Sequence, residues 1–313
     1  MGRRRAAGGT ALDGVLVVDK PAGPTSHDVV GLVRRLSGVH RVGHGGTLDP
    51  FASGVLPVFL GHATRVVEYH MADEKAYRAV VAFGASSTTD DLEGELTPGE
   101  GGLPSRDVVE AALESFRGPI EQVPPAHSAV KVGGRKAYEL ARHGETVELK
   151  ARSVRILALG LVDWSDDPER PTATLEVRCT AGTYIRALAR DLGAALGCGA
   201  YLVALTRTAS GPFRIEDAHS LERLRAALAD GRVQELLLPP DVGLDAMPRL
   251  MLDEGSLAII ARGQPLRLRG VEMPQPGPDG RYRLADEGGR LAAIARLDGG
   301  RLQPEKVFVA PAP

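Results

Sequence analysis

Strand-like and helix-like segments follow one another irregularly along this chain, and that order limits its fold class. Every second residue is apolar from Tyr77 to Phe83 and again from Ala173 to Cys179, which predicts two strands. From Thr183 to Leu196 an apolar residue recurs at every fourth position, which predicts a helix ended by Gly197. Because the elements do not repeat as regular βαβ units, we predict an α+β fold and not a doubly wound sheet.

The expected elements divide the chain into two domains. Further strands are expected at 15–18, 154–159, 281–284, 291–296 and 306–309, and further helices from Thr25 to about Leu36 and at 106–116. After about residue 240 the chain changes to short strands separated by Gly and Pro turns, and 313 residues are enough for about two domains. We therefore predict a disordered basic arm at 1–10, a larger domain at 11–240 and a small β-rich domain at 241–313.

Composition excludes several classes of protein. Hydrophobic residues make up 43% and charged residues 25% of the chain, as in soluble globular proteins. No run approaches the roughly 18 apolar residues of a membrane span, and the first apolar run is too short for an export signal. With Cys179 and Cys198 as the two cysteines, we expect a cytoplasmic protein without structural zinc. A net charge of -2 excludes a uniformly basic surface but leaves room for a local basic face.

A glycine-rich segment at 41–54 is the most unusual part of the sequence. Its three glycines at 43, 45 and 46 permit unusual backbone dihedrals and close approach of a ligand, and Asp49 is held on a stiff turn by the proline after it. The glycine spacing fits neither a P-loop nor a dinucleotide-binding loop. We expect no metal site, because the glycines that separate the nearby histidines keep them off a helix. An ordinary turn rich in Gly and Asp is the alternative interpretation.

Two segments concentrate positive charge. Arg186 and Arg190 are one turn apart and share a face of the expected helix. Between Lys131 and Arg155, seven basic residues outnumber three acidic ones, a net charge of +4 in and beside an insertion at 123–152. Such a glycine-hinged insertion could clamp a phosphate backbone. For both segments, a solvated basic surface is the alternative.

Four segments resemble, in the same order, the TruB family of tRNA pseudouridine synthases. Gly43–Pro57 (GHGGTLDPFASGVLP) is similar to the catalytic motif of that family, with Thr47 where alanine is common. The other three are Val18–Ser26, Val123–Lys131 and Gly182–Gly193. The resemblance covers roughly residues 14–215, and the tail is similar to a PUA-type domain. It implies an α+β catalytic core with a mixed, largely antiparallel sheet and a small C-terminal β-rich PUA-like domain.

The resemblance also implies a reaction. Converting uridine to pseudouridine breaks the N1–C1′ bond, rotates the base and joins C5 to C1′, which requires no redox cofactor, nucleotide or metal. By resemblance Asp49 is the catalytic aspartate, acting as an anion on the sugar, the base or the C2′ proton. Arg186 is its counter-ion, and Tyr77 stacks on the uracil or moves the C5 proton. Leu205 packs on the other side of the base, although periodicity alone places both Tyr77 and Leu205 equally well in the core.

For RNA binding, the resemblance implies that the insertion at 123–152 acts as a thumb that closes over the T arm of tRNA. The target uridine must be flipped out of its stack, and His44 is expected to occupy the vacated place. The expected substrate- or RNA-binding residues are His44, Gly45, Lys20, Tyr184, Leu205, Lys131, Arg135, Lys136 and Arg142. A monomer without an obligatory protein partner is expected.

Three functions remain open from the sequence. The favoured one is isomerisation of the uridine at position 55 in the T loop of tRNA. The same chemistry on another RNA is a second, although the chain lacks a long Lys-rich tail. The third is an RNA-binding tRNA folding factor in which catalysis is secondary, and Asp49→Asn separates it from the other two.

Overall fold

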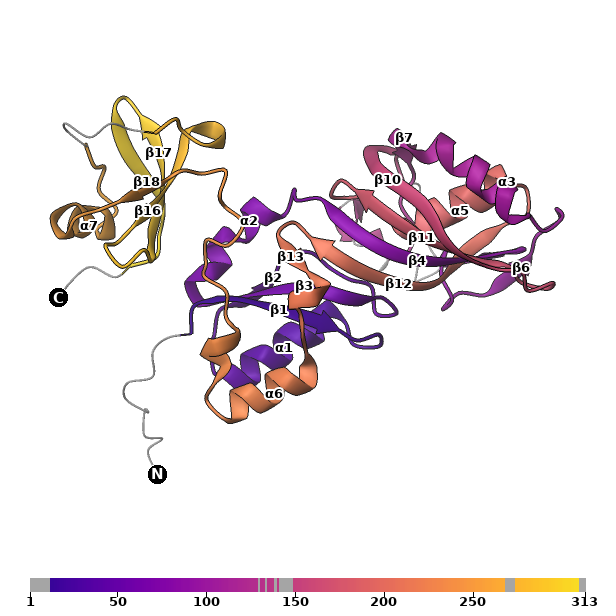
Figure 1. Ribbon diagram of the computed structural model, residues 1–313, viewed down its shortest axis with the longest axis horizontal. Coiled ribbons are helices and arrows are strands. Elements are labelled where there is room, and N and C mark those ends of the chain that lie inside the picture. Colours follow the sequence, from indigo (N-terminus) through magenta and orange to yellow (C-terminus); the bar gives the residue numbers. More distant parts are fainter. Residues whose placement is uncertain are drawn as a thin grey trace.

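The computed structural model describes residues 12–128, 130–132, 134–137, 140, 149–267 and 274–309, with the backbone alone at 131, 132, 136 and 278. These residues form one large sheet with helices packed against it, followed by a separate four-stranded sheet (Figure 1). The predicted arm at 1–10 lies outside the described residues.

The large sheet has ten strands in the order β14-β1-β3-β12-β4-β11-β10-β7, with β13 beside β12 and β2 beside β3. The strands are β1 Gly14–Lys20, β2 Val42–His44, β3 Ser53–Leu60, β4 Lys75–Phe83, β7 Gly118–Gln122, β10 Arg152–Ser165, β11 Thr172–Cys179, β12 Ala200–Ser210, β13 Phe213–Arg214 and β14 His219–Ser220. β1 pairs with β14, and β3 with β12, in parallel, and the other pairs of this sheet are antiparallel. The predicted mixed, largely antiparallel sheet is confirmed.

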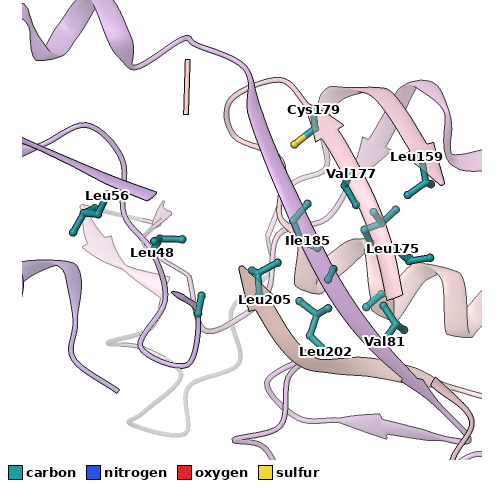
Figure 2. Close-up of a cluster of buried hydrophobic side chains, with 14 of the residues drawn as sticks. Leu48, Leu56, Val81, Leu159, Leu175, Val177, Cys179, Ile185, Leu202 and Leu205 are labelled. Atoms are coloured by element: carbon teal, nitrogen blue, oxygen red, sulfur yellow. The ribbon is translucent and has the colours of Figure 1, made fainter. Parts of the chain in front are cut away.

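One face of the sheet forms the main hydrophobic core. On β4, Ala79, Val81 and Phe83 are buried, as the alternating pattern predicts. The neighbouring strands β11 and β12 add further buried side chains, among them Leu175 and Leu202 in Figure 2. Helix α5 (Ile185–Ala195) covers this face and is the predicted amphipathic helix. The start of α5 is thereby fixed against the sheet.

The first helix is determined by local capping. Helix α1 (Ser26–Ser37) begins after Thr25, whose side chain accepts from the backbone N–H of Asp28, while the Asp28 carboxylate accepts from the Thr25 N–H. It ends at Gly38, which has a φ of 69°. Both ends are as predicted. The other helices are α2 Val67–His70, α3 Arg106–Ala112, α6 Leu221–Ala229 and α7 Glu254–Ala261, and α3 continues as a 3-10 turn over Leu113–Phe116.

The C-terminal sheet has the order β15-β16-β17-β18, with β15 Arg249–Met251, β16 Arg281–Ala285, β17 Leu291–Asp298 and β18 Arg301–Val307. A second hydrophobic cluster joins this sheet to the large one, because Phe59 of β3 and Phe213 of β13 belong to the same cluster as Ile294 of β17 and Phe308. The predicted C-terminal β-rich domain is therefore confirmed, and it shares buried apolar contacts with the catalytic core.

Two short hairpins complete the described chain. Strands β5 (Ala85–Ser87) and β6 (Leu96–Pro98) pair with each other, and β8 (Lys131–Val132) pairs with β9 (Arg135–Lys136). The second hairpin turns through Gly134, whose φ is 85°. It belongs to the predicted thumb-like insertion at 123–152, of which the structure describes only a part.

Some elements differ from the predictions. No element was predicted for β3, β12 or α7, and the strand predicted at 306–309 differs from β18, which ends at Val307. Strand β3 is buried along nearly all its length, so its apolar residues form a continuous run and not an alternation. In α7, Gly255 stands inside the helix, where glycine is unfavourable.

Candidate active site

Asp49 lies in the turn between β2 and β3, at the wall of a cavity of about 320 Å³. Gly46 in this turn has a φ of 124°, which favours glycine. The side chain of Asp49 is 37% exposed, so its carboxylate is open to a molecule in the cavity. A cavity of this size is at the lower end of the range of about 300–1,000 Å³ for ligand sites and suits a nucleotide base.

A buried arginine holds this turn in place. Arg207 of β12 is 1% exposed, and its guanidinium donates to the carbonyls of Gly46, Thr47 and Val55 at 3.0, 3.2 and 2.8 Å. At Gly54 an added Cβ would lie 2.3 Å from the carbonyl oxygen of Arg207, so β3 and β12 can meet only at a glycine. The carbonyls on both sides of the turn are thus fixed by one cation.

A buried lysine supports the other side of the turn. Lys20 is fully buried, and its Nζ donates to the carbonyls of Pro21, Pro24 and Pro50 at 2.9, 2.8 and 3.2 Å. Burial lowers the pKa of Lys20 to about 8, while the charge of Asp49 acts in the opposite direction. The structure places this ammonium group against backbone behind Asp49, and a contact of Lys20 with RNA stays a prediction.

Arg186, on the first turn of α5, joins two carboxylates. Its Nε lies 3.0 Å from Oδ2 of Asp49 and its Nη1 lies 3.4 Å from Oδ2 of Asp91. The guanidinium also donates to the carbonyls of Thr89 at 3.0 Å and His127 at 2.9 Å. The Nε–H does not point along the line to the Asp49 oxygen, so that contact is an ion pair and not an aligned hydrogen bond. Four partners leave the 4% exposed arginine little freedom.

Burial is the largest influence on the charge of Asp49. It raises the pKa of the carboxyl group, the Arg186 guanidinium lowers it, and the nearby Asp91 carboxylate raises it again. The net effect is a pKa above the ordinary range of an aspartate. Arg186 therefore offsets part of the cost of keeping Asp49 ionised in this site.

Tyr77 and Leu205 line the cavity from neighbouring strands. Tyr77 is on β4 and Leu205 is on β12, and both face the space beside Asp49. Figure 2 shows Leu205 between Leu48 of the turn and Ile185 at the start of α5. Burial raises the pKa of the Tyr77 hydroxyl, with the Arg207 charge acting in the opposite direction, so this hydroxyl keeps its proton at neutral pH. The sequence left open whether Tyr77 and Leu205 belong to the hydrophobic core or to the site. In the structure both side chains pack in the core and also form part of the cavity wall.

Two more predicted residues border the same cavity. Gly45 lines it beside the turn, and Tyr184 lines it at the start of α5. The Arg152 guanidinium lies over the Tyr184 ring, 4.9 Å from its centroid. His44 precedes the lining residues, and burial lowers the pKa of its imidazole, which keeps the ring neutral near pH 7.

The predicted thumb residues are only partly described. Lys131 lies on β8, and Arg135 and Lys136 lie on β9, so all three are on one hairpin. Arg135 is exposed. Arg142 lies outside the described residues. The phosphate-binding role of this hairpin stays a prediction.

Sequence reasoning did not identify Asp91, Lys75, Gln122 or Ser128. Asp91 is buried beside Arg186, but Asp90-Asp91-Leu92-Glu93-Gly94 has the composition of an exposed turn. Lys75 and Ser128 line the cavity, and burial lowers the pKa of Lys75. Gln122 is fully buried and pairs with both backbone groups of Tyr184, at 2.8 and 3.0 Å. Gln122 ends the short strand β7, whose sequence GPIEQ carries no signal that this residue is buried.

The site contains no evident place for a metal within the described ranges, where no group of three or more His, Cys, Asp or Glu side chains could hold an ion. No helix in the described part of the chain is long and apolar enough to cross a membrane.

Comparison with known proteins defines the class. Residues 34–185 match the model of the N-terminal domain of the TruB family of pseudouridylate synthases, and residues 186–245 match the model of the tRNA pseudouridylate synthase B C-terminal domain. The chain belongs to the TruB family. It is a pseudouridine synthase, an isomerase that modifies tRNA.

The curated relatives extend over the whole chain. The tRNA pseudouridine synthase B of Chelativorans sp. (strain BNC1) is 41% identical, with 98% of this chain and 99% of the relative covered. That of Pseudomonas aeruginosa (strain UCBPP-PA14) is 42% identical over 95% of this chain and 96% of the relative. The Brucella melitensis relative is 38% identical, covering 99% of this chain and all of the relative.

Solved structures share the fold. The structure titled "Crystal Structure of a Cbf5-Nop10-Gar1 Complex" matches with a TM-score of 0.70 and 27% identity, covering 95% of this chain and 85% of that one. A second, "Structure of H/ACA RNP bound to a substrate RNA containing 2'-deoxyuridine", matches with a TM-score of 0.69 and 26% identity, over 95% and 86% of the two chains. The predicted fold of pseudouridine synthase type is confirmed.

Proposed function

We propose that this enzyme isomerises the uridine at position 55 in the T loop of tRNA, in the cytoplasm, after drawing that base into the cavity beside Asp49. The observation that carries the proposal is the ion pair between Asp49 and Arg186 at the wall of a cavity of about 320 Å³. The names of the full-length relatives support tRNA as the substrate. The cavity is also lined by Tyr77 and Leu205, which are proposed to face the base.

Asp49 is the group that drives the bond exchange. As an anion it can attack the sugar or the base, or remove the C2′ proton, and each route ends with the N1–C1′ bond broken. The freed uracil rotates, C5 forms a bond to C1′, and the C5 proton leaves while N1 gains one. Atoms and charge balance without a redox partner, so the residues of this chain suffice for the reaction.

Arg186 keeps Asp49 reactive and in place. Its guanidinium opposes the rise in the Asp49 pKa that burial causes. Its hydrogen bonds to Thr89 and His127 set the direction from which it meets the carboxylate. A preorganised charge in a water-poor site needs no rearrangement during the reaction, which is where enzymes gain much of their rate.

Tyr77 and Leu205 hold the base. The Tyr77 ring offers an aromatic face to the uracil, and Leu205 offers an apolar surface from β12. The Tyr77 hydroxyl, which keeps its own proton at neutral pH, is proposed to assist transfer of the C5 proton after rotation as a relay that takes up one proton while it gives up another. His44, which directly precedes the lining residue Gly45, is proposed to fill the place that the extruded base leaves, and a neutral imidazole suits that stacked position.

The T arm is held by charge as well as by the pocket. The hairpin of β8 and β9 carries Lys131, Arg135 and Lys136 and is proposed, with Arg142, to contact the phosphates of the T arm. Flipping a base costs a few kcal/mol, and phosphate contacts help to offset that cost. The enzyme is proposed to act as a monomer.

Tritium release from tRNA labelled at C5 of uridine tests the proposal. The wild-type enzyme is expected to release one tritium per tRNA, and a tRNA with cytidine at position 55 is expected to release none from that site. Asp49→Asn is expected to release none while still binding tRNA. Undiminished release with the cytidine-55 tRNA would assign the chemistry to another uridine, and undiminished release by Asp49→Asn would remove Asp49 from the reaction.

A further inference from the structure

The hydroxyl group of Ser128 is buried in the wall of the cavity without a hydrogen-bond partner among the described residues. Ser128 is 4% exposed and is one of the residues that line the cavity together with Asp49 and Tyr77. Buried polar groups in native proteins are hydrogen-bonded in the great majority of cases. An unpaired hydroxyl in the wall of a cavity is therefore available to a molecule that enters the cavity.

The position of Ser128 is fixed by the catalytic arginine. The carbonyl of His127, the residue before it, accepts a hydrogen bond of 2.9 Å from Nη2 of Arg186. The same guanidinium lies 3.0 Å from the Asp49 carboxylate. The unpaired hydroxyl is thus held in a constant relation to the group that drives the reaction, through one rigid side chain.

A second buried serine near the same turn shows the contrast. Ser26 is 2% exposed, and its Oγ donates to the carbonyl of Leu48 at 3.1 Å and accepts from the Leu48 N–H at 2.8 Å. Both hydrogen-bonding capacities of that hydroxyl are used within the protein. Ser26 therefore has a structural role, whereas the Ser128 hydroxyl has no hydrogen-bond partner among the described residues.

We propose that Oγ of Ser128 forms a hydrogen bond with the polar edge of the extruded uracil and that Ser128 is a further base-binding residue of this enzyme. The proposal rests on the proposed function, since it takes the cavity to be the base site. Uracil presents O2, N3–H and O4 along that edge. Rotation of the base about the axis through N3 and C6 exchanges O2 with O4 and leaves N3–H in place.

A hydroxyl group suits this exchange as a donor, because both groups that it meets are carbonyl oxygens. It has one donor and two acceptor positions, and its hydrogen rotates to suit the partner. The same hydroxyl can therefore meet a carbonyl oxygen before rotation and the other carbonyl oxygen afterwards. We infer that Ser128 keeps one hydrogen bond to the base in uridine and in pseudouridine.

The first experiment compares Ser128→Ala with Ser26→Ala in thermal stability and in tritium release from C5-labelled tRNA. Ser128→Ala removes an unpaired hydroxyl, so its Tm is expected to stay the same or rise, while kcat/KM falls about 3- to 10-fold, the size of one neutral hydrogen bond. Ser26→Ala leaves the Leu48 groups unpaired and is expected to lower the Tm by about 2–8 °C. A Tm loss in Ser128→Ala similar to that of Ser26→Ala, or an unchanged kcat/KM, would overturn the proposal.

The second experiment asks whether the partner is the base. Equilibrium binding is measured for Asp49→Asn and for Asp49→Asn with Ser128→Ala, each with unmodified tRNA and with tRNA that has an abasic nucleotide at the target position. Loss of the hydroxyl is expected to weaken binding of the unmodified tRNA about 3- to 10-fold and to leave binding of the abasic tRNA unchanged. An equal loss with both RNAs would place the contact on the ribose or phosphate and would overturn the base-binding role.

Failure of this proposal differs from failure of the proposed function. If the wild-type enzyme releases no tritium from tRNA, the substrate assignment is wrong and the Ser128 proposal falls with it. If the wild-type enzyme is active and Ser128→Ala equals it in rate and in both binding measurements, the proposed function stands and Ser128 has no role in it.

Discussion

The guanidinium of Arg186 lies 3.0 Å from the carboxylate of Asp49 and is at the same time shared with a second, buried carboxylate, that of Asp91. Burial raises the pKa of Asp49 above its ordinary range, the Arg186 guanidinium lowers it, and the Asp91 carboxylate raises it again. Catalysis in this enzyme thus depends on a balance between burial and a shared ion pair, and the predictions below test that balance.

Arg186→Lys keeps the positive charge but loses the planar fork that reaches two carboxylates and two carbonyls. We expect turnover to fall by about 100-fold or more, the size of the effect when one electrostatic donor is removed from an active site. Single-turnover tritium release measures it. Arg190→Lys, one turn further along α5 and paired with Asp90, is the matched control and should retain most activity. Full activity in Arg186→Lys would refute the role of Arg186.

Asp49→Asn should stabilise the protein or leave its stability unchanged while abolishing turnover. Because the folded pKa of Asp49 is raised, the folded state binds more protons than the unfolded state between the two pKa values. The contribution of Asp49 to stability therefore grows as pH falls through the folded pKa and is unfavourable above it. Chemical unfolding at pH 7 and at pH 4 measures the free energy of unfolding of both proteins. The value of the wild type relative to that of Asp49→Asn should be higher at pH 4 than at pH 7. A lower stability of Asp49→Asn at pH 7 would contradict the raised pKa.

The acidic limb of the pH–rate profile should reflect the same shift. Turnover needs the Asp49 anion, so the rate is expected to fall with decreasing pH at a midpoint above the value of about 4 for an exposed aspartate. Single-turnover rates between pH 4 and pH 8 measure this midpoint. A midpoint at or below about 4 would show that Arg186 outweighs burial.

Deprotonation of Lys20 above pH 8 should lower the activity while the contribution of Lys20 to stability rises. Its pKa of about 8 in the folded protein lies below that of a free lysine, so between pH 8 and about 10.5 the unfolded state binds more protons and this group favours folding increasingly as pH rises. The neutral amine has one N–H fewer for the three proline carbonyls, so turnover should fall above pH 8. Lys20→Met should be slower at every pH and should lack this alkaline decline. An identical decline in Lys20→Met would assign it to another group.

Tyr77→Phe separates stacking from proton transfer. Phenylalanine keeps the aromatic face but removes the hydroxyl, so affinity for tRNA should change by less than about twofold, while completed product falls by about 100-fold, the lower end of general acid–base effects. A filter-binding measurement and mass spectrometry of the RNA, which detects uncompleted product, test both expectations. Normal product formation would leave stacking as the only role of the Tyr77 side chain.

Added salt should weaken the binding of tRNA more than it slows the catalytic step. If the β8–β9 hairpin contacts phosphates, the association constant should fall steeply and linearly with salt concentration on a logarithmic plot. The kcat at saturating tRNA should change much less, because the cavity contacts are mostly uncharged. Arg135→Gln should make the slope shallower by about one phosphate contact. A flat salt response would contradict the phosphate clamp.

Local signals in the sequence were sufficient for α1 and α5, because a capping box and an apolar stripe act within the element itself. Strand β12 was not predicted, although Leu205, Arg207 and Ala209 are buried at alternate positions of it. A charged residue in that buried series interrupts the apolar alternation by which a strand is recognised in a sequence.

For the site, the resemblance indicated Asp49, Tyr77 and Arg186, and the structure brings them to one cavity. The supporting residues could not be predicted in the same way. Lysine and arginine are rarely buried, so Lys20 and Arg207 gave no sign that their cations hold backbone carbonyls behind the turn. That information is in contacts that the folded chain makes, such as Lys20 with Pro50 and Arg207 with Val55.

The apolar cluster that links Phe59 with Ile294 and Phe308 limits how the two domains can move relative to each other. A hydrophobic junction of this kind opposes hinge motion between domains. The C-terminal sheet is thereby kept at a set distance from Asp49. We therefore expect that a tRNA can contact both parts at once only if the distance between its two contact points matches this fixed separation.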